Sequence, residues 1–262
     1  MNTTRTAATI LLSLTLSFCA TSEQKVEKER EQNPKYQYNV GIFYLNNGQP
    51  DEAIKYLEKA LMLQPDFDLA LDGMGLAHTM KGNFEDAIKF FNRCLIANPT
   101  LTDAHNHLGS VYQELGMLSE AEEQFLAAVA DEAYHSRELP LYNLARLYYT
   151  QGKNERALEF VDRALNSNQR MPMALNLRGL IYERAERFQE AIVCYQDALR
   201  LIPEDINLTY NLAGAFFKDK NYVKAKEMFT ALQSRVADPE MRANIERYLD
   251  MINREIRFTQ TG

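Results

Sequence analysis

One pattern recurs six times between Pro34 and Ala237, and it constrains the fold of this 262-residue chain more than any other feature. Its clearest element is an alanine that is followed, four residues later, by a large apolar side chain. Successive alanines are separated by 34, 34, 36, 34 and 34 residues, at Ala53, Ala87, Ala121, Ala157, Ala191 and Ala225. A fixed period near 34 is typical of stacked helix-turn-helix repeats, so the pattern predicts an all-α solenoid.

Two further sets of positions indicate how the helices of each repeat pack. Small residues recur in the first helix, at Gly41, Gly75, Gly109, Ala145, Gly179 and Ala213. The large residues that follow the alanines are Leu57, Phe91, Phe125, Val161, Tyr195 and Phe229. Small residues let two helices approach closely, and we expect the rings and leucines to fill the space to the next repeat.

The turn between the two helices carries glycine in the first four repeats, at Gly48, Gly82, Gly116 and Gly152. Glycine adopts positive φ at a helix end without steric cost. Glu186 and Lys220 occupy the same position in the last two repeats. We therefore expect those two turns to be tighter or differently capped.

These residues resemble the tetratricopeptide repeat (TPR) pattern over some 200 residues. The resemblance implies a right-handed superhelical solenoid of six TPR hairpins. Their expected ranges within 34–237 are 34–67, 68–101, 102–137, 138–171, 172–205 and 206–237. Asp238-Pro239-Glu240 supplies an N-cap and an N1 proline for one more helix, so we expect a capping helix over 238–257 and a tail at 258–262.

Composition and motifs argue against several other functions. The formal net charge of −7 disfavours a nucleic-acid partner, which requires a basic face. The sequence contains no catalytic constellation, metal-ligand spacing or glycine-rich phosphate loop, so we expect no enzyme activity, no cofactor and no metal. We interpret Cys94 and Cys194 as small buried residues, three repeats apart and too distant for a disulfide.

The N-terminus has the pattern of a secretory signal over residues 1–18, with Arg5 before an apolar stretch too short to span a bilayer. Leu16-Ser17-Phe18-Cys19 resembles the bacterial lipobox, which implies lipidation of Cys19, although Phe18 stands where a small residue is usual. Residues 19–33 are polar and should form a tether. Ala20 resembles an outer-membrane address in Gram-negative bacteria; the alternative is a chain secreted to the periplasm.

In the TPR family the first helices line a concave groove, and we expect that groove to bind a protein or an extended peptide. An asparagine amide can both donate to and accept from a peptide backbone, and rings add contact area. The alternative is that some of these asparagines bond within the helix pairs. The candidate groove residues are Tyr38, Asn39, Ile42, Leu45, Leu76, Asn106, Tyr142, Asn143, Arg146, Tyr149, Asn176, Tyr210, Asn211 and Phe217.

The 36-residue step between repeats three and four indicates which group of TPR proteins the chain resembles. There Asp131-Glu132-Ala133-Tyr134 replaces the usual helix-ending proline and leads to Tyr142-Asn143-Leu144-Ala145. This break is similar to that of the TPR lipoproteins of type IV pilus biogenesis, the secretin pilotins. The resemblance implies an outer-membrane lipoprotein, monomeric alone, that assists secretin assembly or localisation and meets the membrane only through its lipid. The alternative is a periplasmic adaptor for envelope proteins such as peptidoglycan hydrolases.

Overall fold

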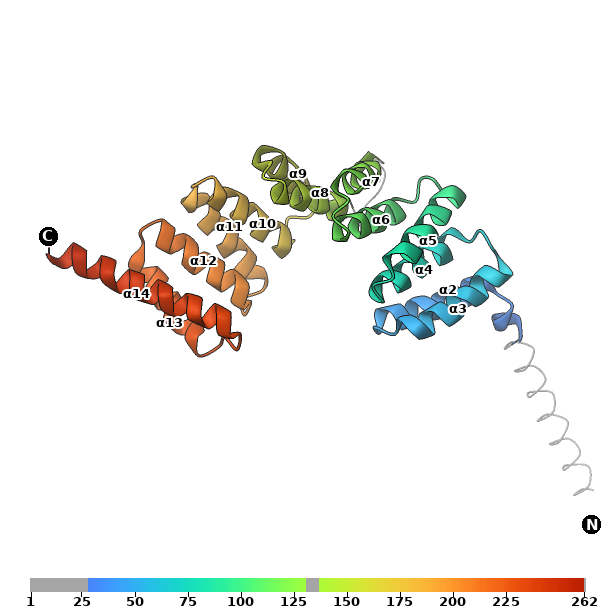
Figure 1. Ribbon diagram of the computed structural model, residues 1–262, viewed down its shortest axis with the longest axis horizontal. Helices are drawn as coiled ribbons and strands as arrows, with labels where there is room; N and C mark the ends of the chain where they lie inside the picture. Colours follow the sequence, from blue (N-terminus) through green and yellow to red (C-terminus); the bar gives the residue numbers. More distant parts are fainter. Residues whose placement is uncertain (1–27, 131–136, 262) are drawn as a thin grey trace, which may run out of the picture. The chain divides into compact units, whose positions relative to one another are not determined.

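The computed structural model describes residues 28–130 and 137–261, and the regular structure in these ranges is α-helical (Figure 1). Consecutive helices form hairpins: α2 (Pro34–Asn46) and α3 (Pro50–Leu63), α4 (Asp68–Met80) and α5 (Phe84–Ala97), α6 (Thr102–Glu114) and α7 (Leu118–Ala130), α8 (Glu138–Thr150) and α9 (Asn154–Ser167), α10 (Pro172–Arg184) and α11 (Phe188–Leu201), α12 (Ile206–Lys218) and α13 (Tyr222–Gln233). One more helix, α14 (Pro239–Thr261), follows them. The predicted all-α, TPR-like solenoid is confirmed.

The chain divides into two compact units, whereas the repeat pattern alone suggests one elongated domain. Unit 1 extends to Ala128 and contains the first three hairpins; unit 2 begins at Val129 and contains α8 to α14. The division falls near the end of α7, within the irregular 36-residue step from Ala121 to Ala157. The Asp131-to-Tyr134 motif lies outside the described residues, as do the predicted signal segment and Cys19.

Each hairpin closes where a small residue of the first helix meets a large residue of the second. A Cβ added to Gly75 would lie 2.4 Å from a ring carbon of Phe91, and one added to Gly179 would lie 2.5 Å from the Tyr195 ring. Both rings are completely buried. The recurring large residues therefore fill space within their own hairpin, against its glycine, which explains why the two positions recur together.

The last two turns have the same backbone geometry as the glycine turns, so the prediction that they differ was wrong. The φ angles of Glu186 and Lys220 are 56° and 62°, close to the 69° of Gly48. In each case the positive-φ residue donates its N–H to a carbonyl three residues back, as Gly48 does to Leu45 and Glu186 to Glu183. Packing of the two helices enforces this turn even where the side chain disfavours it.

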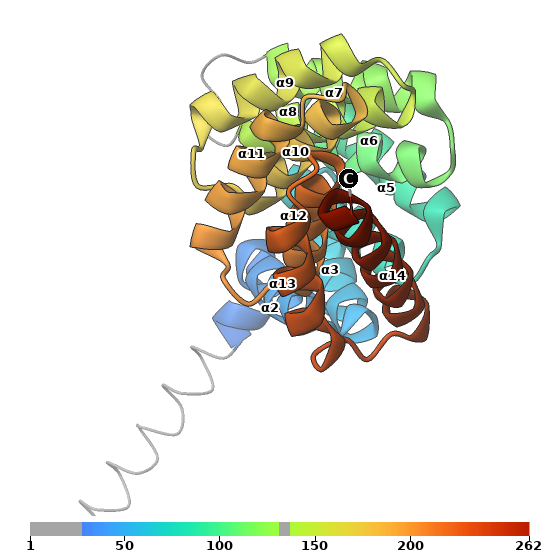
Figure 2. The ribbon, with the colours of Figure 1, turned by 90° about the vertical axis from the view of Figure 1, so that its left-hand side faces the viewer.

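Within each unit the hairpins stack through their helices in a regular way. Each second helix packs on the first helix of the next hairpin, as α3 does on α4 and α11 on α12. First helices also contact one another: α2 with α4, α4 with α6, and α8 with α10. At the end of unit 2, α14 lies beside α13 (Figure 2). It continues to Thr261, so residues 258–261, predicted to be a tail, belong to this helix.

Candidate partner-binding face

The predicted groove residues lie on first helices, and polar side chains of neighbouring first helices meet at a spacing of 35 residues. The contacts that define this row are Asp72–His107 in unit 1, and Tyr149–Arg184, Asn176–Asn211 and Glu183–Lys218 in unit 2. One repeat plus one residue therefore separates the partners. We call the surface that α2, α4 and α6 form around these contacts the first-helix face of unit 1. The corresponding surface of α8, α10 and α12 is the first-helix face of unit 2.

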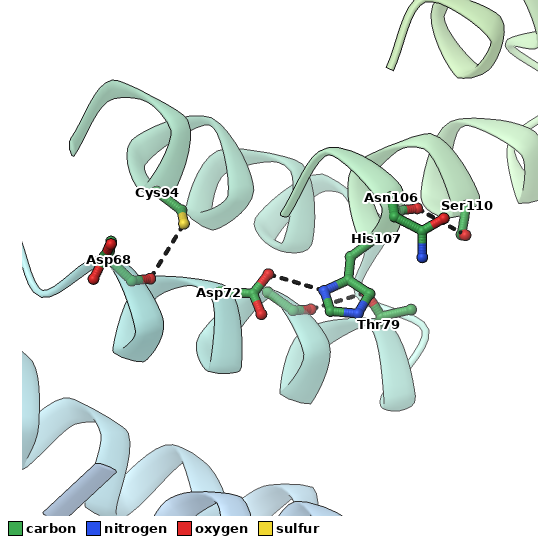
Figure 3. Close-up of polar contacts among 8 residues, drawn as sticks. Asp68, Asp72, Thr79, Cys94, Asn106, His107 and Ser110 are labelled. Atoms are coloured by element: carbon green, nitrogen blue, oxygen red, sulfur yellow. Dashed lines mark hydrogen bonds and ion pairs between the residues drawn. The ribbon is translucent and has the colours of Figure 1, made fainter. Parts of the chain in front are cut away.

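A hydrogen-bonded acid–histidine pair, in which Asp72 is buried and His107 half-buried, joins the second and third hairpins of unit 1 (Figure 3). His107 Nδ1 lies 2.9 Å from Asp72 Oδ1, and Asp72 is only 8% exposed. Burial alone would lower the pKa of His107, but the hydrogen bond to Asp72 and the charges of Asp72 and Asp103 raise it above its ordinary value. The charged form of His107 is therefore stabilised between α4 and α6.

The cysteines of the described residues are unreactive core residues. Cys94 and Cys194 are free and buried, which confirms the prediction. The Cys94 thiol donates to the Asp68 carbonyl, with Sγ and O 3.2 Å apart (Figure 3). Burial, reinforced by the charges of Asp72 and Asp68, raises the pKa of the Cys94 thiol to about 12, so it stays protonated at neutral pH.

The first-helix face of unit 1 is acidic around Tyr38. The Tyr38 ring packs on Phe67 with centroids 5.4 Å apart. Burial raises the pKa of the Tyr38 hydroxyl, and three neighbouring carboxylates raise it further. These carboxylates are Asp72, Asp103 and Asp68. Beside Tyr38, Asn39 is exposed, and Asn106 on α6 is half-buried.

Three other predicted groove residues of unit 1 contribute to the core. Leu45 is 8% exposed and belongs to the buried cluster of the first two hairpins, so its assignment to the groove was wrong. Ile42 and Leu76 are half-buried and pack against the same cluster. Ile42 reaches α4 there, since a Cβ added to Gly73 would lie in van der Waals contact with it at 3.5 Å.

In unit 2 the asparagines bond to each other between hairpins. Asn211 Nδ2 of α12 donates to Asn176 Oδ1 of α10 at 2.9 Å. This contact joins neighbouring first helices, and it differs from the alternative of bonding within one helix pair. Each amide keeps one group, the Asn176 nitrogen and the Asn211 oxygen, for a further hydrogen bond.

The side chains of α8 on this face are half-buried: Tyr142, Asn143, Arg146 and Tyr149. The Arg184 guanidinium lies over the Tyr149 ring, 3.7 Å from its centroid. Arg184 Nη1 also donates to the Tyr149 carbonyl at 2.7 Å. Tyr149 is thus held against α10 and presents only part of its ring.

A buried tyrosine fixes the carboxylate of Glu183 at the end of α10. The Tyr195 hydroxyl donates to Glu183 Oε2 at 2.8 Å, and Lys218 of α12 pairs with Glu183 Oε1. Burial first, and then the charge and hydrogen bond of Glu183, raise the pKa of Tyr195. The contact fastens α12 to the fifth hairpin and neutralises Lys218.

Two predicted groove rings of the sixth hairpin, Tyr210 and Phe217, contact the capping helix. Tyr248 of α14 lies edge-on to Phe217, with centroids 5.2 Å apart, and edge-on to Tyr210 at 6.2 Å. The same ring stacks on Phe229 of α13 at 4.7 Å. Tyr210 and Phe217 are half-buried and belong to an aromatic cluster at the end of unit 2, so their assignment to the groove stays a prediction.

Other kinds of site were sought along residues 28–130 and 137–261. In this part of the chain no group of three or more His, Cys, Asp or Glu side chains is placed to hold a metal ion. None of the helices described there is long and apolar enough to cross a membrane.

Comparison with known proteins agrees with this architecture. The tetratricopeptide repeat family matches residues 34–67 and 102–130. The family of the tetratricopeptide repeat protein 21 C-terminal ARM domain matches residues 131–245. The chain therefore has the fold of tetratricopeptide repeat proteins.

Among individual proteins, it resembles the type IV pilus assembly protein PilF of Pseudomonas aeruginosa. The two are 25% identical over 189 residues, which cover 70% of this chain and 75% of PilF. The solved structure of P. aeruginosa pilF superposes with a TM-score of 0.76 at 16% identity, covering 84% of this chain and 99% of that one. PilW, described as a widely conserved type IV pilus biogenesis factor, gives 0.75 at 17% identity, covering 81% and 97%. These relatives are named as pilus factors and not as enzymes.

Sequence reasoning missed the contacts that connect neighbouring first helices, namely Asp72 with His107, Tyr149 with Arg184 and Glu183 with Lys218. The search used positions that repeat every 34 residues, whereas these contacts join residues 35 apart. A search for complementary polar residues at this second spacing would have found them.

Proposed function

We propose that this protein is an outer-membrane lipoprotein that holds a segment of the type IV pilus secretin and assists the assembly or localisation of that pore. It acts without catalysing a reaction. The observation that carries the proposal is the similarity to PilF, which extends over 189 residues and most of both chains. The lipobox-like Cys19 and the motif from Asp131 to Tyr134 support it at the level of sequence.

The first-helix face of unit 2 suits this role because it combines rings, amides and cations. Tyr142 and Tyr149 offer area with little loss of conformational freedom. The Asn176–Asn211 pair offers one donor and one acceptor to a peptide backbone. A segment in extended conformation could use both, since its own backbone groups are unpaired.

Deletion of the gene and complementation in the native bacterium test the proposal. Cells that lack the protein should lose secretin multimers from the outer membrane, and the wild-type chain should restore them. The Cys19→Ser variant should leave the membrane fraction and restore multimers poorly. Secretin multimers that are unchanged by the deletion would contradict the proposal, and a wild-type chain that takes up no radiolabelled fatty acid would remove the lipid anchor from it.

The groove itself is tested with the double variant Tyr142→Ala, Asn143→Ala. Purified variant protein should recover less secretin from detergent extracts than wild type and should keep its helical circular dichroism. The matched control is Glu159→Ala, an exposed position on α9. Equal recovery by wild type and the double variant would move the binding face elsewhere.

A further inference from the structure

Arg184 is an exposed cation that the fold holds in one position. It is the last residue of α10, and its guanidinium lies 3.7 Å from the Tyr149 ring centroid. Nη1 donates to the Tyr149 carbonyl at 2.7 Å and to Asn154 Oδ1 at 3.4 Å. A ring below it and two acceptors at one nitrogen restrict the side chain, so little conformational freedom remains to be lost on binding.

All three contacts of Arg184 are neutral, which distinguishes it from comparable cations in unit 2. Arg187 lies 4.4 Å from the Tyr182 ring centroid but pairs with Glu190 at 2.8 Å. Lys218 occupies the equivalent position one hairpin later and pairs with Glu183. Among the described residues no carboxylate forms an ion pair with Arg184, and neither Nε nor Nη2 donates to an acceptor there.

The free edge of this guanidinium has the geometry that carboxylates bind best. Nε and Nη2 point in parallel and can donate two charge-assisted hydrogen bonds to the two oxygens of one carboxylate. The Tyr149 ring shields one face from water, which strengthens the attraction. The helix C-terminus also favours a cation at this position, so a purely structural role is the competing explanation.

We infer that Arg184 recognises a carboxylate of the segment bound on the first-helix face of unit 2, either an Asp or Glu side chain or the C-terminal carboxylate. The inference rests on the proposed function, because it names one contact with the bound segment. Arg184 would then fix the register of that segment relative to Tyr149 and the Asn176–Asn211 pair.

The test uses synthetic peptides that tile the periplasmic region of the type IV pilus secretin of the same bacterium. Each peptide is acetylated and amidated, and binding to the mature full-length chain is measured by fluorescence anisotropy. The peptide that binds tightest is remade with each acid replaced by its amide, and the peptide that ends at the secretin C-terminus is also made as the free acid. The amide-substituted peptides test an Asp or Glu side chain as the bound carboxylate, and the free-acid peptide tests the C-terminal carboxylate.

For wild type, loss of the recognised carboxylate should weaken binding by about tenfold or more. Arg184→Gln should weaken the acid peptide equally and should not distinguish acid from amide. Arg187→Gln, the ion-paired control, should bind as wild type. If Arg184→Gln binds the acid peptide as tightly as wild type, or weakens acid and amide peptides alike, the inference is wrong while the proposed function stands. If wild type binds no peptide, both fail.

Discussion

Units 1 and 2 each contain three helical hairpins of the same kind, formed by different sequences. In unit 1 every turn has glycine at its positive-φ position, whereas unit 2 has glycine at one turn and Glu186 and Lys220 at the others. Residues 28–128 carry 8 Lys and Arg against 15 Asp and Glu, and residues 137–261 carry 19 against 17. The backbone of the repeat is therefore determined by few positions, and the remaining positions are free to differ.

The first-helix faces differ in the same way. In unit 1 the face is acidic, and its polar contact between Asp72 and His107 joins a buried and a half-buried side chain. In unit 2 the face carries half-buried rings and amides and the exposed cation of Arg184. We therefore propose that unit 2 recognises the partner and that the polar pair of unit 1 serves stacking.

The largest effect should come from emptying the core of unit 1. Phe91→Ala removes a fully buried ring that packs on Gly75 and should lower the free energy of unfolding by about 3–5 kcal/mol. Tyr195→Phe keeps the equivalent ring in unit 2 and loses only the hydroxyl contact with Glu183, which should cost about 1 kcal/mol. Urea denaturation measures both. Equal losses would mean that the hydroxyl, and not ring packing, dominates in unit 2.

Adding one methyl group should have opposite signs in the two units. Gly75→Ala places a Cβ against the Phe91 ring and should destabilise by about 1–3 kcal/mol. In unit 2, Gly214 lies in the interior of α12, where a Cβ would meet open space, so Gly214→Ala should stabilise by about 0.5–1 kcal/mol. Thermal denaturation distinguishes the signs; stabilisation by both variants would contradict the close packing described for unit 1.

The turns should respond in opposite directions as well. Gly116→Ala forces a Cβ into positive φ and should cost about 1 kcal/mol. Glu186→Gly relieves that strain at the equivalent turn of unit 2, but it adds freedom to the unfolded chain, so a gain below about 1 kcal/mol is expected. If Glu186→Gly destabilises as much as Gly116→Ala, the side chain of Glu186 contributes a contact that offsets its strain.

The smallest expected effect is a pH dependence that belongs to unit 1. Because the folded state raises the pKa of His107 above its unfolded value of about 6.5, its contribution to stability is complete below that pH and is lost as pH rises through the higher folded value. The free energy of unfolding of wild type, relative to His107→Gln, should therefore fall as pH rises across this window. Parallel curves for the two proteins would show that the Asp72–His107 pair does not respond to pH.

The sequence was sufficient for the fold because the glycines, rings and alanines that close each hairpin recur at one period and have one physical purpose. The site was less predictable. Leu45 and Tyr210 occupy groove positions in the repeat, but Leu45 lies in the buried cluster of the first two hairpins and Tyr210 contacts Tyr248 of α14. Contacts between neighbouring first helices join residues that are 35 apart. A position that recurs every 34 residues does not reveal such pairs.

The account is tested most directly by asking which face of the protein touches the secretin in the cell. A photo-crosslinking amino acid is placed at Tyr142 on α8 and, in a separate strain, at exposed Glu159 on α9. Irradiation followed by immunoblotting should yield an adduct with the secretin from position 142 and none from position 159. An adduct from position 159 alone, or from neither position in cells that assemble the pore, would contradict the account.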